Sequence, residues 1–393
     1  MAVINRVAEF TPEIAGWRQH LHRNPELLFD LAGTSAFVAE KLREFGCDIV
    51  ETGIGQSGVV AVIRGRSGSS RRRIGLRADM DALPIEEIGE AGYRSQVPGK
   101  MHACGHDGHT AMLLGAARYL AETRNFDGEA VLVFQPAEEG ANGARAMLDD
   151  GLMERFGIQE IYGMHNLPGM EVGRFAVRAG PVMAAADTFR ITLNGKGAHA
   201  AMPHMGRDPI VAACHLVTAL QSIVSRDVDS LDRAVVSVGR ISAGDAFNVI
   251  PHSAEILGTV RTFSAQVQDL VEKRLAEIAC QIAAVFGSQA EAAYSREVPA
   301  MINRPEQAAL LERVASGIVG EDNVVTDMPA MMGAEDFAEM LNARPGAYLF
   351  VGNGDSAALH HPAYDFSDDA IPYGVSLWAR LVETAMPAGG GRP

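Results

Sequence analysis

The sequence has few cysteines, no long apolar segment and no apparent signal at its N-terminus. Its four cysteines are scattered without the spacing of a disulfide framework: Cys47, Cys104, Cys214 and Cys280. No stretch approaches about 18 uninterrupted apolar residues, and charged residues appear at the N-terminus before any long apolar run. These absences argue against a secreted or membrane-spanning chain. We expect a cytoplasmic protein in a reducing compartment.

Positive charge is also scarce. The chain has 34 basic and 49 acidic residues and a formal net charge of -15 at pH 7, which would repel nucleic-acid phosphates and anionic lipid headgroups. We therefore expect no nucleic acid and no membrane among its partners. The first strand-to-helix turn lacks the G-x-G-x-x-G pattern of dinucleotide-binding enzymes, which argues against that class.

The chain is long enough for two domains. At 393 residues, 47% of them hydrophobic, it exceeds the size at which one core usually stops growing. Short apolar strands alternate with helices over 58–163, and another such strand lies at 347–351, a pattern typical of an α/β fold with a doubly wound, largely parallel sheet. Between about 184 and 296 the order becomes β-α-β-β-α-β, which predicts an inserted α+β open-faced sandwich. We expect one domain over 1–184 and 297–393 and an inserted domain over 185–296.

One stretch of nine residues, Met101 to His109, contains a thiol, three imidazoles and a carboxylate. Cysteine sulfur and histidine nitrogen bind divalent transition ions well. Cys104 and His106, separated by one glycine, can turn toward one ion or bridge neighbouring ions. The alternative is a histidine-bearing loop without a metal. The combination of a thiol with several histidines favours a metal site, which needs further ligands from elsewhere in the chain.

Further metal-type residues follow predicted strands, and doubly wound sheets bind ligands beyond the carboxyl ends of their strands. These residues are Asp79, Asp81, Glu138, Glu139, His165, His360 and His361. Asp79 and Asp81 could cap a helix, but we expect Asp81 to orient a histidine ligand such as His106. Of the paired glutamates, one would bind metal while its neighbour acts as a general base. The alternative is a pair of exposed glutamates in a first helical turn.

Three residues of the inserted domain are candidates for contacts with a substrate. His199 lies in a glycine-rich turn that would expose its side chain, although a surface histidine without a role is equally compatible. Asn248 and Arg261 could be a turn residue and a salt-bridge partner. An arginine near a metal site is also a common binding group for a substrate carboxylate.

Together these residues resemble the dinuclear metallo-amidohydrolases, the family of hippurate hydrolases, N-acyl-amino-acid amidohydrolases and indole-acetyl-amino-acid hydrolases, relatives of carboxypeptidase G2 and aminoacylase. The resemblance runs from about Trp17 to Trp378. Its motifs are Arg23-Asn24-Pro25-Glu26, Asp79-Met80-Asp81-Ala82-Leu83-Pro84, His102-Ala103-Cys104-Gly105-His106-Asp107, Gln135-Pro136-Ala137-Glu138-Glu139-Gly140, Gly163-Met164-His165-Asn166, Gly197-Ala198-His199-Ala200, Met332-Gly333-Ala334-Glu335-Asp336-Phe337 and Leu359-His360-His361-Pro362.

The resemblance implies two divalent metal ions, zinc or manganese, with cobalt or nickel also compatible. The implied ligands are Cys104, His106, Glu139, His165 and His360. In the family the last histidine is followed by a variable residue and a proline, which favours His360, although the double histidine leaves His361 open. Glu138 would be the catalytic base. Asn248 and Arg261 match positions that hold the carboxylate end of the substrate.

The implied activity is metal-dependent hydrolysis of the amide bond of N-acyl or N-aroyl amino acids. Glu138 would activate a water shared by the ions, and His199 would stabilise the oxyanion from the inserted domain, which acts as a lid or dimerisation domain. We expect a homodimer with a small-molecule substrate, in which His199 serves the active site of the partner subunit. The alternative is a dipeptidase, carboxypeptidase or aromatic deaminase with the same dinuclear site. A binding protein without activity is disfavoured, because neither Glu138 nor a ligand is missing.

Overall fold

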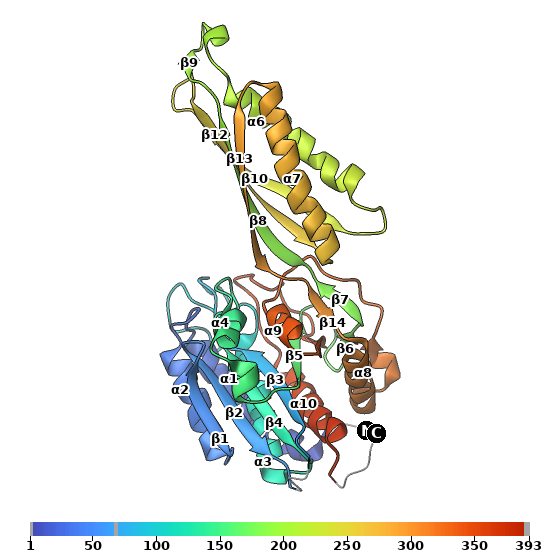
Figure 1. Ribbon diagram of the computed structural model, residues 1–393. Helices are drawn as coiled ribbons and strands as arrows, with labels where there is room; N and C mark the ends of the chain where they lie inside the picture. Colours follow the sequence, from blue (N-terminus) through green and yellow to red (C-terminus); the bar gives the residue numbers. More distant parts are fainter. Residues whose placement is uncertain (1–2, 67–69, 389–393) are drawn as a thin grey trace. The chain divides into compact units, whose positions relative to one another are not determined.

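The computed structural model describes residues 3–66 and 70–388 and divides into two compact units (Figure 1). The first unit comprises Met1–Val182, Ile302–Pro329 and Asp336–Pro393, and the second comprises Met183–Met301 with Ala330–Glu335. The second unit is therefore inserted into the sequence of the first, and it contains the segment 185–296.

The first unit contains an eight-stranded mixed sheet with the order β1-β2-β4-β3-β5-β16-β6-β15. Its strands are β1 (Ile49–Ile54), β2 (Gly58–Arg64), β3 (Arg73–Asp79), β4 (Glu129–Gln135), β5 (Glu160–Leu167), β6 (Phe175–Val177), β15 (Val324–Val325) and β16 (Gly346–Gly352). The neighbours β4, β3, β5 and β16 run parallel, whereas β1 with β2, β2 with β4, and β6 with β16 are antiparallel. The parallel strands are buried over nearly their whole length, as expected for strands covered on both faces.

Helices cover both faces of this sheet. They are α1 (Asn5–Arg23), α2 (Ala32–Glu44), α3 (His106–Thr123), α4 (Gly143–Asp149), α5 (Leu152–Arg155), α8 (Pro305–Val319), α9 (Phe337–Ala343) and α10 (Ile371–Ala385). Ala130, Leu132 and Phe134 alternate along β4 and share one hydrophobic core with α1, α3 and α10. Val131 and Val133 lie between them and are buried on the other face, where α4 contacts β4 and α9 contacts β5.

The carboxyl ends of the parallel strands meet at one edge of the sheet. β3 runs beside β4 with Asp79 opposite Gln135, and β5 runs beside β16 with His165 opposite Phe350. The loops over 80–105, 136–142 and 353–367 leave this edge. Because parallel neighbours end at the same edge, residues far apart in the sequence converge there.

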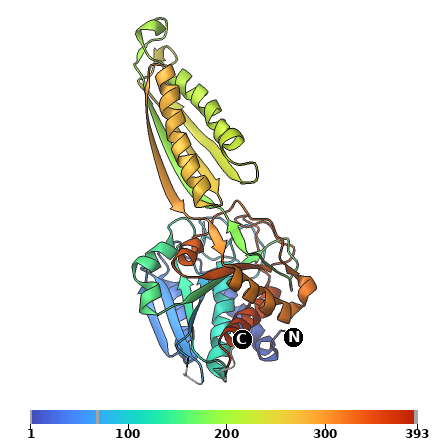
Figure 2. The same cartoon turned by 45° about the vertical axis from the view of Figure 1, so that its right-hand side comes forward.

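The second unit contains a four-stranded antiparallel sheet with two helices on one face (Figures 1 and 2). Its main elements are, in chain order, β8 (Ala185–Asn194), α6 (Pro209–Ser222), β10 (Ala234–Ala243), β12 (Ser253–Thr262), α7 (Ala265–Val285) and β13 (Gln289–Val298). The strand order is β10-β12-β8-β13, and apolar side chains of both helices and of the strands form one core. The short strands β9 (Ala198–His199) and β11 (Val249–Ile250) form a separate pair. The strands β7 (Gly180–Met183) and β14 (Met301–Asn303) also pair with each other, and most of their residues belong to the first unit.

The fold class predicted from the sequence is confirmed: a doubly wound α/β sheet carries an inserted α+β open-faced sandwich. Two local features differ from the expectation. The strand β1 is not predicted, because the middle of this strand is exposed and carries no apolar run. The spacing of apolar residues predicts a helix only over 12–22, but helix α1 begins at Asn5 and continues through Pro12. Val7, Phe10 and Ile14 bury one face of the helix and offset the hydrogen bond that proline cannot donate.

Candidate metal centre

Four segments of the first unit bring metal-type side chains together. Cys104 and His106 lie at the start of α3, a glutamate pair follows β4, His165 lies at the end of β5, and His360 follows β16. Their donor atoms form three overlapping groups, each within 4.8 Å: Cys104 with His106 and His165; Cys104 with Glu139 and His360; His106 with Glu138 and Glu139. Because the first two groups share only Cys104, the donors suit two ions better than one.

The backbone at Cys104 is shaped for close contact with the end of β5. Gly105 has a φ of 92°, a value that favours glycine. A Cβ at this position would lie 2.3 Å from Asn166 Nδ2, so a larger residue would push the two segments apart. As a result the buried Cys104 sulfur lies 3.3 Å from His165 Nε2.

Main-chain carbonyls fix the orientation of two histidines. His106 Nδ1 lies 2.8 Å from the Asp81 carbonyl, and His165 Nδ1 lies 2.7 Å from the Asn166 carbonyl. Because a carbonyl only accepts, Nδ1 carries the proton in both rings, and Nε2 of the neutral ring keeps its lone pair. Within residues 3–66 and 70–388, His106 Nε2 is among the buried polar atoms without a hydrogen-bond partner. Nitrogen, thiol and carboxylate donors gathered around the buried Cys104 fit a divalent transition ion.

Asp81 holds the turn that carries Glu138 and Glu139. Its carboxylate accepts the main-chain N–H groups of Glu138 (3.0 Å) and Glu139 (3.1 Å) and lies 3.4 Å from His106 Nδ1. Ala137 has a φ of 53°, an uncommon value for alanine, which turns the chain sharply after β4. The sequence predicts that Asp81 orients His106. In the structure its carbonyl makes that contact, while its carboxylate positions the paired glutamates.

His360 lies opposite Glu139, with His360 Nε2 3.3 Å from Glu139 Oε1. Its φ of 64° is uncommon outside glycine, and its N–H donates to the Ala103 carbonyl (2.8 Å). The chain therefore holds an uncommon backbone conformation that presents this side chain. His361 Nδ1 instead accepts the N–H of Ala363 (3.1 Å). Of the two histidines, the structure places His360 beside the other candidate ligands.

Burial and neighbouring charges set the ionisation of these groups. Burial raises the pKa of Cys104 and lowers the pKa of His165 well below its usual value. Hydrogen bonds with Cys104 and Glu139 raise the pKa of His360 to about 10. Burial alone would raise the pKa of Glu139, but His360 and His106 outweigh burial and lower it. A cation that binds to such donors displaces their protons.

The three substrate contacts predicted in the second unit lie at opposite ends of its sheet. His199 is exposed and pairs with Val249, next to Asn248. These residues lie close to Ser253, where β12 begins. Arg261 lies near the other end of β12, about eight residues and therefore roughly 26 Å further along the strand.

Buried polar residues to which the sequence assigns neither a ligand role nor a catalytic role also contact the site. The Tyr364 hydroxyl donates to Asn166 Oδ1 (2.8 Å), and Asp79 Oδ1 lies 2.6 Å from His109 Nδ1. The sequence places His109 close enough to the metal to contact a ligand but not to be one, and gives Asp79 no more than a possible cap. The position of Asn166, directly after His165 at the end of a strand, is a signal in the sequence that could have identified it. No sequence signal connects Tyr364 to these residues.

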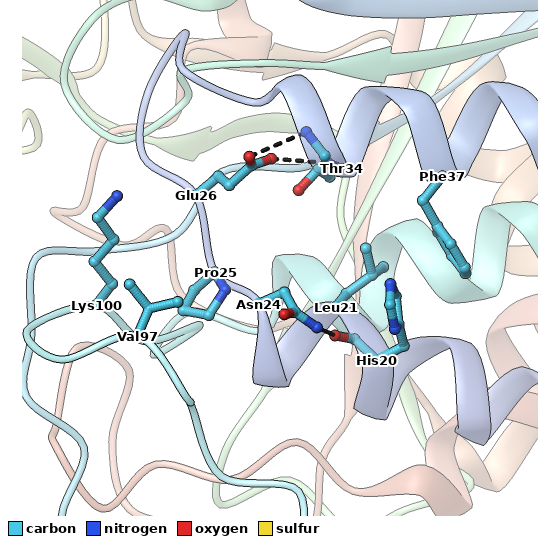
Figure 3. A pocket seen from close by; sticks show the side chains of 10 residues that line it. His20, Leu21, Asn24, Pro25, Glu26, Thr34, Phe37, Val97 and Lys100 are labelled. Carbon is cyan, nitrogen blue, oxygen red and sulfur yellow. Dashed lines mark hydrogen bonds between the residues drawn. The ribbon is translucent and has the colours of Figure 1, made fainter.

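A separate hollow of about 450 Å³ lies at the start of α2 (Figure 3). Both carboxylate oxygens of Glu26 accept main-chain N–H groups there, from Gly33 (3.0 Å) and Thr34 (2.7 Å). The His20 ring stacks on Phe37. Among the described residues, none of those lining the hollow belongs to a metal-type group. Glu26 therefore contributes to the start of α2 and not to a metal site.

Comparison with known proteins adds to this geometry. A model of peptidase family M20/M25/M40 matches residues 75–384. The chain is 40% identical over 381 residues to the hippurate hydrolase of Campylobacter jejuni, covering 97% of this chain and 98% of the relative. It is 42% identical over 360 residues to the N-acetyl-L-cysteine deacetylase of Bacillus subtilis, covering 91% and 85%. The crystal structure of the Bacillus subtilis YXEP protein, described as a dinuclear metal binding peptidase from the M20 family, is similar with a TM-score of 0.86 and 34% identity, covering 96% and 99%.

Proposed function

The chain belongs to peptidase family M20/M25/M40 and is an amidohydrolase of that family, and from this premise we propose that it hydrolyses the amide bond of N-acyl or N-aroyl amino acids. The observation that carries the proposal is the group of thiol, imidazole and carboxylate donors around the buried Cys104, which includes the paired acids Glu138 and Glu139. Similarity to a hippurate hydrolase and to an N-acetyl-L-cysteine deacetylase over most of their length supports this substrate class.

In this proposal two divalent ions bind to Cys104, His106, Glu139, His165 and His360. We infer zinc or manganese, with cobalt or nickel also compatible, because thiol and imidazole ligands suit transition ions and leave the choice to metal supply. When bound, the ions would polarise the amide carbonyl and lower the pKa of water. The chain holds its histidines in the required tautomer through main-chain carbonyls.

Glu138 is the general base of this proposal. His106 Nε2 lies 4.0 Å from a carboxylate oxygen of each glutamate, but Glu139 also faces His360. This second contact assigns Glu139 to the metal and leaves Glu138 to take a proton from the attacking water. Asp81 supports this role, because it holds the main-chain N–H of Glu138 and so limits the positions of the carboxylate. After the carbonyl is attacked, Glu138 returns the proton to the leaving nitrogen, acting first as base and then as acid.

The contacts in the second unit support a homodimer. His199 and Asn248 belong to a separate strand pair near Ser253, and Arg261 lies roughly 26 Å from Ser253 along β12, which is further than a small N-acyl amino acid extends. The three side chains of one chain therefore do not meet on one substrate. We propose that His199 of the partner subunit stabilises the oxyanion and that Asn248 and Arg261, from different subunits, hold the substrate carboxylate.

An exposed apolar surface on the second unit also supports the dimer. The helical segment Pro209–Asp227 is long and apolar enough to cross a membrane, yet one such helix is a weak indication, and 33% of its most apolar window is buried. Ile210 and Val211 on this helix are exposed, as is Ile241 on the edge strand β10. Exposed apolar side chains, one of them on an edge strand, are typical of an interface between identical subunits. The cytoplasmic location and the absence of nucleic-acid and membrane partners stay predictions.

A substrate panel tests the proposed activity. Hippurate, N-acetyl amino acids, dipeptides and amino-substituted aromatic acids would be compared before chelation, after chelation, and after zinc or manganese is restored. We expect hydrolysis of hippurate or N-acetyl amino acids that is lost on chelation and regained with metal. Faster cleavage of dipeptides would favour a peptidase, an alternative that the family description supports. A rate that chelation leaves unchanged would contradict the metal-dependent site.

A further inference from the structure

A chain of hydrogen bonds passes through the interior of the first unit beside the candidate ligands. It connects Asp79, His109 and Asn166, each of which is at most 2% exposed. Asp79 Oδ1 lies 2.6 Å from His109 Nδ1. His109 Nε2 lies 3.0 Å from the main-chain nitrogen of Asn166 and 3.1 Å from its Nδ2. We call these three residues the buried strut.

The directions of these hydrogen bonds follow from the groups themselves. The main-chain N–H of Asn166 can only donate, so His109 Nε2 must accept and carries no proton. The proton of the neutral ring is therefore on Nδ1 and is donated to the Asp79 carboxylate. By distance alone, Asp79, His106 and His109 could also hold a metal ion. However, both ring nitrogens of His109 already have hydrogen-bond partners, which argues against His109 as a metal ligand.

The Asn166 side chain connects this strut to the Cys104 segment. Its Nδ2 donates to the Cys104 carbonyl (2.7 Å), and its Oδ1 accepts from Tyr364 (2.8 Å). Its main-chain carbonyl accepts from His165 Nδ1. One asparagine therefore contacts the backbone of one candidate ligand and the ring of another.

We propose that Asn166 and His109 are positioning residues that set the distance between the Cys104 sulfur and His165 Nε2. This inference rests on the proposed function, because it assigns a role toward the same metal site. The strut holds the two donors together before a metal binds, so that less of the binding free energy is spent on ordering them. Groups that orient metal ligands in this way typically contribute 10- to 100-fold in metal affinity.

Asn166→Asp is the main test. The substitution keeps the size of the side chain but replaces the N–H donor with an oxygen, which faces the lone pairs of the Cys104 carbonyl and of His109 Nε2. Asn303→Asp is a matched control. Asn303 is equally buried, its Nδ2 donates to the Tyr348 carbonyl (2.7 Å), and its Oδ1 accepts the Tyr348 N–H (2.7 Å), but Tyr348 is not a candidate ligand.

His109 is tested with a conservative and a disruptive variant. His109→Gln can donate to Asp79 and accept from Asn166 through one amide, whereas His109→Leu can do neither. A merely structural role would make the two variants differ in stability alone. A positioning role predicts that Gln restores the metal properties that Leu loses.

The measurements use the full chain after chelation and titration with cobalt. Cobalt affinity by competition, the near-ultraviolet thiolate-to-cobalt band and the free energy of unfolding of the metal-free chain would be recorded. We expect Asn166→Asp and His109→Leu to bind cobalt 10- to 100-fold more weakly with a shifted thiolate band. Asn303→Asp should lose stability but keep the affinity and the band, and His109→Gln should remain close to the wild type.

Three results would overturn the proposal, and they are distinguishable. If the wild type binds cobalt without a thiolate band, the proposed metal site itself is wrong. If Asn166→Asp and Asn303→Asp have the same affinity and band as the wild type, the site stands and the strut has no positioning role. If His109→Leu loses one of two bound ions while Asn166→Asp keeps both, His109 is a ligand.

Discussion

Glu138 and Glu139 are chemically identical neighbours with different surroundings. Asp81 holds both main-chain N–H groups, so both residues lie on one turn that a single carboxylate fixes. Glu139 Oε1 lies 3.3 Å from His360 Nε2 and completes a group with Cys104. These contacts support two roles within one dipeptide, a ligand and a base.

Replacing Glu138 separates these roles. Glu138→Gln keeps the shape of the side chain but cannot accept a proton, so we expect turnover to fall by at least about a hundredfold while metal content is unchanged. Metal analysis and initial rates on hippurate measure the two effects. Glu171→Gln, at an exposed position, is the control. Near wild-type turnover with a full metal complement would show that another group is the base.

His22 is a second residue whose charge depends on its surroundings. Its Nδ1 lies 2.8 Å from Asp107 and its Nε2 lies 3.5 Å from Glu87. Burial alone would lower the pKa of His22, but the two carboxylates outweigh burial and raise it to about 9. Arg18, also buried, lies 3.8 Å from the same Asp107 carboxylate. These contacts join α1 to α3 through charge inside an otherwise apolar core.

The pKa of His22 predicts a pH-dependent stability. Because the folded pKa lies above the unfolded value of about 6.5, the stabilisation is complete below pH 6.5 and is lost as the pH rises toward 9. We expect the free energy of unfolding of the metal-free wild type to exceed that of His22→Asn by roughly 3 kcal/mol at low pH. This difference should shrink above about pH 7. Urea unfolding at several pH values measures it. His20→Asn, on the exposed side of α1, serves as the control.

At the scale of elements, α2 begins without a cap of its own. Its N-cap residue Leu31 makes no side-chain hydrogen bond, and Glu26 from the preceding loop accepts the N–H groups of Gly33 and Thr34 instead. The Glu26 carbonyl also accepts the Ala82 N–H (2.8 Å). One residue therefore starts a helix with its side chain and holds the segment next to Asp81 with its backbone.

This arrangement predicts that Glu26 contributes to stability and little to activity. Glu26→Ala removes the cap and should lower the free energy of unfolding by about 1 kcal/mol, measured by urea denaturation. The main-chain hydrogen bond to Ala82 remains, so the rate on hippurate should stay near that of the wild type. Glu40→Ala, exposed on the same helix, serves as the control. A large loss of activity with unchanged stability would mean that the side chain acts on the site directly.

At the scale of the whole molecule, the separation of His199 from Arg261 within the second unit predicts shared active sites. Glu138→Gln and His199→Ala should each be nearly inactive alone. In a mixed dimer, one site combines an intact Glu138 with His199 of the partner subunit. Random exchange should therefore restore about a quarter of the wild-type activity, since half of the dimers are mixed and half of their sites are complete.

Activity measurements after co-refolding the two variants test this prediction, with each variant refolded alone as the control. A mixture that stays as inactive as its components would place both residues of a working site in one chain. Sedimentation or light scattering on the same samples shows whether a dimer is present, which separates a failed dimer from a failed active-site assignment.

The sequence alone determined the pattern of elements and the chemistry available at the strand ends. Short runs of apolar residues identified the strands of the parallel core, because a strand that is buried on both faces requires near-continuous apolar residues. The thiol and histidines around Cys104 indicated a metal, because few other roles need these groups so close together. Both features are visible in the composition of short segments, so they could be predicted without knowledge of long-range contacts. The strand β1 has exposed residues in its middle, and composition did not reveal it.

Only the tertiary structure decided which groups meet and in which state. It placed His360 and not His361 beside Glu139, bound Asp81 to the glutamate turn, and buried Asn166 between Cys104 and His165. The carbonyls that select the tautomers of His106 and His165 likewise depend on backbone positions. Hydrogen bonds act over about 3 Å and between fixed donor and acceptor directions. Residues far apart in the sequence reach the required distance and direction only in the folded chain. The spacing of residues in the sequence therefore cannot predict these contacts.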